Sequence, residues 1–270
     1  MINLLDRIRD CICHPKIIGR YNRDKIGKIL LFVLFFFFVY VVVFGVRTFT
    51  ENPLEGKGNE LTSLVISKQD KTVEYDSETF ILTGDFVKIE TENVGLYVLP
   101  NEDVYINSYI LNVVLEEDMA YVYFGDIEIS SISYKDIQTK DFSFENISSN
   151  ESKDILYFKM FIEGILESSY DYFRMINFVE GVISTASLYL MLFLVCFLFA
   201  RMVNPTIEGK VRAKLVLYDN VVFLVFTILA SLFNQGWLAY VAYSLPMIYT
   251  MITFRHIVRV VVPKNNNKEV

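Results

Sequence analysis

Cysteine and histidine are scarce in this sequence of 270 residues, and their scarcity excludes several kinds of protein. There are three cysteines, Cys11, Cys13 and Cys196, and the long polar middle of the chain, residues 47–177, contains none of them. That region is therefore not a domain held together by disulfide bonds. Only two histidines are present, His14 and His256, and the zinc-protease pattern H-E-x-x-H does not occur.

Other catalytic signatures are also missing. The sequence has no glycine-rich phosphate-binding loop, no G-x-S-x-G nucleophile elbow and no C-x-x-C pair. We therefore expect a protein that is not an enzyme and that needs no cofactor. An enzyme would instead require polar side chains that converge only in the folded chain, at the border of the membrane.

Charge is distributed unevenly along the chain, although the net charge is only −7. Residues 1–28 hold seven Lys and Arg against three Asp, whereas residues 47–180 hold ten basic against twenty-six acidic residues. A surface this acidic repels phosphate groups, so nucleic acid is excluded as a partner.

Apolar residues are abundant, at 53% of the chain, and mean hydropathy is +0.36. Residues 29–46 carry no charge and are bracketed by Lys28 and Arg47; all but Tyr40 and Gly45 are Leu, Ile, Val or Phe. A helix of this length covers about 27 Å, close to the thickness of the hydrocarbon layer of a bilayer. The stretch predicts a transmembrane helix. It is too long for the apolar region of a signal peptide, and no A-x-A-like cleavage site follows it.

Three further spans are predicted at residues 178–200, 215–233 and 237–254. The loop 201–214 and the tail 255–270 are rich in Lys and Arg, whereas the turn between the last two spans is uncharged. By the positive-inside rule, both termini and this loop are cytoplasmic and residues 47–177 lie outside. We therefore expect a multi-pass protein of the cell membrane, with the lipid bilayer as its first partner.

Short runs of β-branched and aromatic residues fill residues 47–150, separated by turn-forming residues. The predicted strands are residues 64–67, 80–83, 86–91, 96–99, 104–107, 110–115, 120–124 and 127–130. Their spacing, with no helical stretch between them, favours an antiparallel meander or a small sandwich. The expected fold class is an α+β membrane protein in which an extracytoplasmic antiparallel β-rich domain is inserted between the first and second of four transmembrane helices.

Residues 151–177 have a helical pattern and are predicted to form a stalk that continues into the second span. One apolar seam runs along it: Ile155, Phe158, Ile162, Ile165, Ser169, Tyr172 and Ile176. The seam fits packing against the β domain. The alternative is a coiled coil with a second copy, which would make the protein a homo-oligomer.

The N-terminal residues 1–28 are predicted to begin with a short amphipathic helix that ends before Pro15. Leu4, Leu5, Ile8 and Ile12 have helical spacing, with charged residues between them. Two placements remain open. The helix either lies on the inner membrane surface or packs on the other cytoplasmic segments.

Asp219 is the most unusual residue of the spans because it lies one turn inside the third of them, next to Asn220. A carboxylate there is costly unless it reaches water or a partner. We predict an ion pair between Asp219 and Arg255, at the end of the fourth span; a role in binding a proton or a substrate is the alternative. In the fourth span, Pro246 removes a backbone hydrogen bond and predicts a helix kink.

Two clusters are candidates for metal binding. Cys11, Cys13 and His14 could hold a soft metal with a further ligand from elsewhere, but their spacing is not a recognised zinc pattern. Ordinary interfacial residues or lipidation of the thiols are the alternatives. The acidic run at residues 116–118 lacks the spacing of a calcium-binding loop and fits a solvated turn between strands.

Several short segments resemble an uncharacterised bacterial membrane-protein family catalogued as domain of unknown function 1189. They are residues 15–21, 87–91, 111–118 and 133–134, Lys214 and Leu215 with Tyr218, and residues 244–246. Glu90 stands where the family pattern leads us to expect Asp. The resemblance implies a protein of Gram-positive-type bacteria with four to six spans and an outer β-rich domain. It implies no activity, because no functional residues are established for that family.

The expected function is a non-enzymatic binding, scaffolding or accessory role in the bacterial cell envelope, with a membrane or envelope protein as partner. The alternative is a subunit or accessory of a membrane transporter. Transport predicts that Asp219, Asn220 and Pro246 face one interior pathway, whereas an accessory role predicts that they face neighbouring helices.

Overall fold

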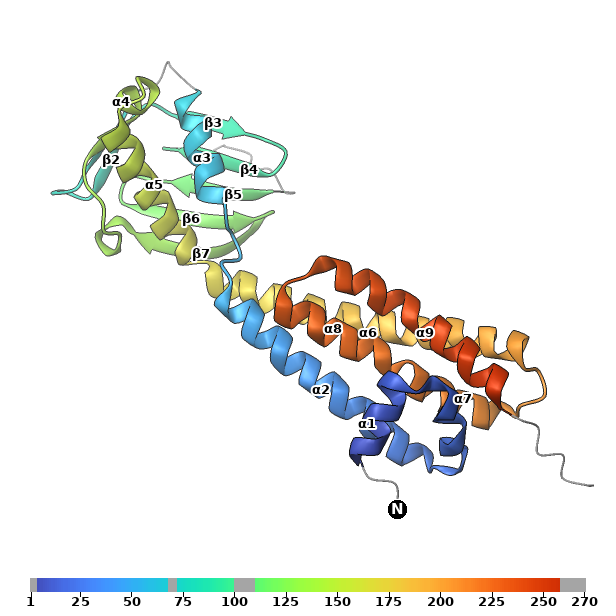
Figure 1. Cartoon of the computed structure of the whole chain (residues 1–270). Coiled ribbons are helices and arrows are strands. Elements are labelled where there is room, and N and C mark those ends of the chain that lie inside the picture. The colour runs from blue at the N-terminus through green and yellow to red at the C-terminus, as the bar shows by residue number, and fades with distance from the viewer. Residues whose placement is uncertain (1–3, 68–71, 100–109, 258–270) are drawn as a thin grey trace, which may run out of the picture. The chain divides into compact units, whose positions relative to one another are not determined.

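The computed structural model describes residues 4–67, 72–99 and 110–257, and the chain forms two compact units (Figure 1). Met1–Thr50 and Phe178–Val270 form one, which we call the helical unit, and Glu51–Asn177 form the other, the β unit. Each unit has a hydrophobic core of its own.

The described residues contain four helical stretches that are long and apolar enough to cross a membrane. They are α2 Ile26–Thr50, α6 Tyr170–Val203, α7 Gly209–Asp219 continued by α8 Val221–Phe233, and α9 Gly236–His256. All four predicted apolar spans are therefore helical, and the protein is a multi-pass membrane protein. Within the helical unit, α8 packs against both α2 and α9, and the Tyr40 hydroxyl of α2 accepts a hydrogen bond of 2.8 Å from Thr185 of α6.

The β unit consists of two sheets and three α-helices in its described residues. The strands are β1 Val73–Asp76, β2 Ile81–Gly84, β3 Val87–Glu90, β4 Val94–Val98, β5 Leu111–Leu115, β6 Met119–Phe124, β7 Ile127–Ser133 and β8 Phe142–Ser143. Their order is β2-β1-β8 in one sheet and β3-β4-β5-β6-β7 in the other. The helices are α3 Lys57–Ile66, α4 Phe144–Ser148 and α5 Ser152–Glu167.

The antiparallel prediction is confirmed for every strand pair of the described residues except one, since β4 and β5 run parallel. A parallel pair needs a long connection, and twelve residues separate β4 from β5 in the sequence. The predicted strand at residues 64–67 is wrong: these residues end helix α3, in which Leu61 and Val65, one helical turn apart, are both fully buried. The predicted strand at residues 104–107 lies outside the described residues.

The apolar seam of residues 151–177 is packed into the β unit as far as Ser169, whereas Tyr172 and Ile176 are exposed. Phe158, Ile162 and Ile165 are fully buried in its core, and Phe161 packs against the rings of Tyr75, Tyr134 and Phe142. This arrangement corresponds to packing against the β domain, the first of the two alternatives. The predicted continuous stalk is interrupted at residues 168–169, between α5 and α6.

Candidate functional site: a buried polar network in the helical unit

The N-terminal segment is folded back onto the long helices of the helical unit. It consists of α1 Leu4–Cys13 and the 3-10 helix η1 Pro15–Arg23, and η1 lies against α7 and α9. Arg7, Asp10 and Cys11 have the spacing of one helix face, and this face of α1 is the buried one, whereas Leu5 is 70% exposed. The structure therefore matches the packed placement of this helix.

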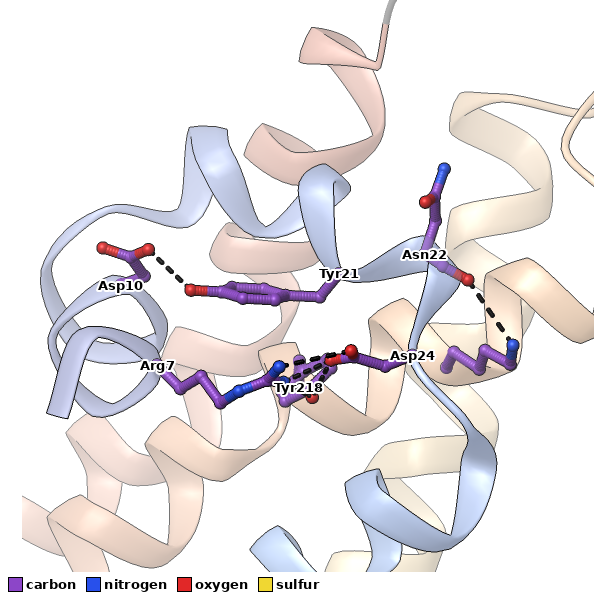
Figure 2. A network of polar contacts seen from close by, with 7 residues as sticks. Arg7, Asp10, Tyr21, Asn22, Asp24 and Tyr218 are labelled. Atoms are coloured by element: carbon purple, nitrogen blue, oxygen red, sulfur yellow. Dashed lines mark hydrogen bonds and ion pairs between the residues drawn. The ribbon is translucent and has the colours of Figure 1, made fainter. Parts of the chain in front are cut away.

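Arg7, Asp24 and Tyr218 form the first half of the network (Figure 2). The Arg7 guanidinium donates hydrogen bonds to both carboxylate oxygens of Asp24 and one of 2.5 Å to the Tyr218 hydroxyl. The Tyr218 hydroxyl in turn donates a hydrogen bond of 2.7 Å to Asp24. A two-pronged, charge-assisted pair of this kind is stronger than a neutral hydrogen bond. The hydrogen bond from Arg7 is the main reason that the pKa of Asp24 lies below its ordinary value, although burial opposes the shift.

Asp10 and Tyr21 form the second half. Asp10 is fully buried and accepts a hydrogen bond of 2.7 Å from the Tyr21 hydroxyl. It also forms ion pairs with Arg20, at 3.4 Å, and with Arg9, at 3.3 Å. The Tyr21 ring connects the two halves, since its centroid lies 4.9 Å from the Arg7 guanidinium carbon (Figure 2). Burial, followed by the hydrogen bond to Asp10, raises the pKa of Tyr21.

Side chains of α7 and α9 bind the backbone carbonyls of the N-terminal segment. Tyr249 donates to the carbonyl of Ile12, and Thr253 lies 3.0 Å from that of Pro15. Lys214 donates over 3.4 Å to the carbonyl of Asn22 (Figure 2). The carbonyls of Ile12 and Asn22 lie in the last turns of α1 and η1 and lack partners within the helix, so these contacts satisfy them. The carbonyl of Pro15 begins η1 and receives the Thr253 contact in addition to its bond within that helix. All three contacts help to fix the segment in place.

The third span is interrupted where α7 ends at Asp219 and α8 begins at Val221. Asp219 and Asn220 are fully buried at the break, and Asp219 Oδ1 lies 2.7 Å from the Thr253 hydroxyl. Asp219 Oδ2, both polar side-chain atoms of Asn220 and the Thr250 hydroxyl have no hydrogen-bond partner. Asn220 keeps right-handed helical backbone angles, so the third span continues through this local irregularity.

The structure gives Asp219 a different partner from the predicted Arg255. The Arg255 side chain is exposed, and Thr253 takes its place beside the carboxylate. The reason is helical periodicity: residues two apart in α9 point to different faces, so Thr253 and Arg255 cannot both face α7. Pro246 lies inside α9 and is buried; the kink stays a prediction.

The predicted thiol and imidazole cluster is not assembled. Cys11 is fully buried, whereas Cys13 and His14 are exposed. Burial raises the pKa of the Cys11 thiol. The described part of the chain contains no group of three or more His, Cys, Asp or Glu residues placed to hold a metal ion. The acidic residues 116–118 are exposed and border a cavity of about 590 Å³ in the β unit.

No family model, curated protein or solved structure matched this chain. The class that the fold defines is therefore a multi-pass membrane protein with four candidate spans and a separately packed β unit. Its distinguishing site is the network of Arg7, Asp10, Tyr21, Asp24 and Tyr218, together with the helix break at Asp219.

Proposed function

We propose that the protein is a non-enzymatic scaffold or accessory of the bacterial cell envelope. In this proposal the helical unit is an anchor, and the β unit binds a membrane or envelope protein. The observation that carries the proposal is the use of polar groups in the helical unit. Arg7, Asp10, Asp24 and Tyr218 bind one another and the N-terminal segment, instead of lining a passage.

Burial at the helix break favours this role over transport. Asp219 and Asn220 are 0% exposed and Pro246 is buried, as expected for residues that face neighbouring helices. A transport pathway requires polar side chains that reach a water-filled cavity.

The β unit supports the binding half of the proposal. It has a core of its own, so it can present a folded surface independently of the anchor. The strong acidic excess of residues 47–180 favours a partner with a basic or mixed surface, because complementary charge accelerates association. The proposed orientation has both termini and the loop 201–214 in the cytoplasm and the β unit outside.

The partner is tested by purifying the full-length protein in mild detergent and identifying co-purifying proteins by mass spectrometry. We expect a stoichiometric membrane or envelope protein, lost when exposed acidic residues of the β unit are reversed, as in Glu92→Lys with Glu117→Lys. Reversal of the exposed Glu208 in the helical unit is the matched control and should leave the complex intact. A protein that purifies without any stoichiometric partner, or that catalyses substrate uptake alone in vesicles, would contradict the proposal.

Orientation is tested with a thiol probe that cannot enter intact cells. Cys13 is a naturally exposed thiol, and Asn93→Cys places a second one at an exposed turn of the β unit. We expect the probe to modify position 93 in intact cells and Cys13 only after lysis. The reverse pattern would overturn the proposed topology.

A further inference from the structure

The Thr253 hydroxyl lies between two buried acceptors. Its Oγ1 is 2.7 Å from Asp219 Oδ1 and 3.0 Å from the carbonyl oxygen of Pro15. A hydroxyl has one proton and donates to one acceptor at a time, and an ionised carboxylate can only accept. With Asp219 ionised, the Thr253 proton therefore reaches only one of them: either the Asp219 carboxylate loses this hydrogen bond, or the Pro15 carbonyl keeps only its bond within η1.

Within residues 4–67, 72–99 and 110–257, no positively charged group faces Asp219 to stabilise a carboxylate. The titratable groups that face it are the Cys11 thiol of α1, the Cys196 thiol of α6 and the Tyr249 phenol of α9, and the Thr250 hydroxyl is also near. None of them is a cation. Asp219 Oδ2 is buried without a geometrically formed hydrogen bond, and the neutral hydroxyls of Thr250 and Thr253 are the polar groups near the carboxyl, so an ionised Asp219 would have no charged partner among the described residues.

We propose that Asp219 is a proton-binding site, held as the neutral carboxylic acid in the folded protein. The acid then donates from Oδ1 to Thr253 Oγ1, and Thr253 donates its own proton to the carbonyl of Pro15. One added proton satisfies both contacts without moving a heavy atom. The separation of 2.7 Å is the usual length of such an O–H···O bond.

Protonation of Asp219 completes hydrogen bonds between the N-terminal segment and the long helices. Pro15 begins η1, Thr253 belongs to α9 and Asp219 ends α7, so the chain of hydrogen bonds joins three elements. When a base in solvent takes the proton, the Asp219 carboxylate competes for the Thr253 proton and the Pro15 carbonyl loses its contact with α9. The segment is then expected to open more readily around Pro15 as the pH rises, while the contacts of Arg7 with Asp24 and Tyr218 remain.

Infrared spectroscopy of the full-length protein in detergent tests the protonation state directly. The wild type at neutral pH should show the C=O stretch of a protonated, buried carboxylic acid. Asp219→Asn should lack that band, and Asp10→Asn should keep it, because Asp10 is paired with arginines. A wild-type spectrum without the band, or one in which Asp219→Asn retains it, overturns the proposal.

Cysteine labelling tests the coupling to the N-terminal segment. Cys11 is buried beside Asp219 and Cys13 is exposed, so the Cys11-to-Cys13 labelling ratio reports local opening of the segment. Burial raises the pKa of the Cys11 thiol, so part of the rise of this ratio with pH comes from thiol ionisation; Asp219→Asn, whose amide donates to Thr253 in the same way, measures that part. In the wild type the ratio should rise with pH more steeply than in Asp219→Asn, by up to about a further tenfold per unit, the limit for release of one proton. An equal rise in both proteins, or a flat ratio in the wild type, overturns the coupling.

Discussion

Tyr218 and Asp24 are joined by a hydrogen bond of 2.7 Å, although they are distant in the sequence. Asp24 precedes α2 and Tyr218 lies near the end of α7, so the bond connects two of the long helices. Arg7 adds the N-terminal segment to the same carboxylate. These three residues thus determine how the beginning of the chain packs on the helical unit.

Removing Arg7 should loosen this packing. Arg7→Met leaves Asp24 without its cation, and we expect a loss of ~3 kcal/mol of stability, as for other broken buried pairs. The double variant Arg7→Met with Asp24→Asn should recover part of the loss because no charge is then left unpaired. Thermal unfolding in detergent measures both. The matched control is Arg9→Met, whose side chain is 58% exposed; a loss as large as that of Arg7→Met would refute the assigned role of Arg7.

Low pH should weaken the contact between Arg7 and Asp24. The hydrogen bond from Arg7 lowers the pKa of Asp24 from its ordinary value of 3.8. A carboxyl whose pKa is lower in the folded than in the unfolded protein stabilises the folded state at any pH above its unfolded-state pKa. This contribution is lost as the pH falls through its folded-state pKa. We therefore expect the hydrogen exchange of residues 4–23, corrected for its intrinsic pH dependence, to accelerate below about pH 4. Arg7→Met with Asp24→Asn should lack this dependence, and an identical acid response in that variant would exclude Asp24 as the cause.

The four spans can be predicted from the sequence because each is a long apolar run with at most one charged residue, Glu180 in the second and Asp219 in the third, and only a membrane accounts for so many of them. The polar network cannot be predicted in full. Arg7 and Asp10 share one face of α1, as their spacing indicates, but only the fold brings Tyr218 to Asp24. An antiparallel hairpin of the third and fourth spans predicts the Asp219–Arg255 pair, yet the rotation of α9 presents Thr253 instead.

The β unit illustrates the limit of periodicity. Strands β2 to β7 are recognisable from β-branched and aromatic runs, whereas residues 64–67 have the same composition and are helical. Composition alone does not distinguish a short buried helix end from a strand. The parallel pairing of β4 and β5, which twelve residues separate in the sequence, is not encoded by any local pattern.

The aromatic core of the β unit should be sensitive to truncation. Phe161 is fully buried, with ring centroids of Tyr75, Tyr134 and Phe142 within 5.2 Å. We expect Phe161→Ala to cost ~3–5 kcal/mol, because it removes packing and leaves a cavity. On the same helix, Leu156 is 53% exposed, and Leu156→Ala should change stability by less than ~1 kcal/mol. Chemical unfolding of the full chain measures the difference; equal losses would contradict this description of the core.

The β unit should fold when it is separated from the helical unit. Residues 51–177 form one compact unit with a continuous core, so the fragment retains the contacts that stabilise it. We expect a soluble product with near-ultraviolet circular dichroism from its buried tyrosines and a single cooperative unfolding transition. The same fragment with Phe161→Ala is the control and should unfold at lower denaturant. A fragment that lacks the near-ultraviolet signal would show that its core depends on the helices.

Gly84 should tolerate no side chain. It ends β2 with φ of +132°, and a Cβ atom at this position would overlap the backbone oxygen of Thr72. A backbone atom beside the partner strand cannot move away as a flexible side chain would, so we expect Gly84→Ala to destabilise the β unit by more than ~2 kcal/mol. Gly56 distinguishes the cost of the steric overlap from the cost of a positive φ. Its φ is +83°, but a Cβ atom there would have no neighbour within 4 Å. Gly56→Ala therefore carries only the conformational cost of the left-handed region, about 1 kcal/mol. Urea unfolding of the two variants should show the larger loss for Gly84→Ala, and the opposite order would mean that the close approach of β2 to Thr72 relaxes without cost.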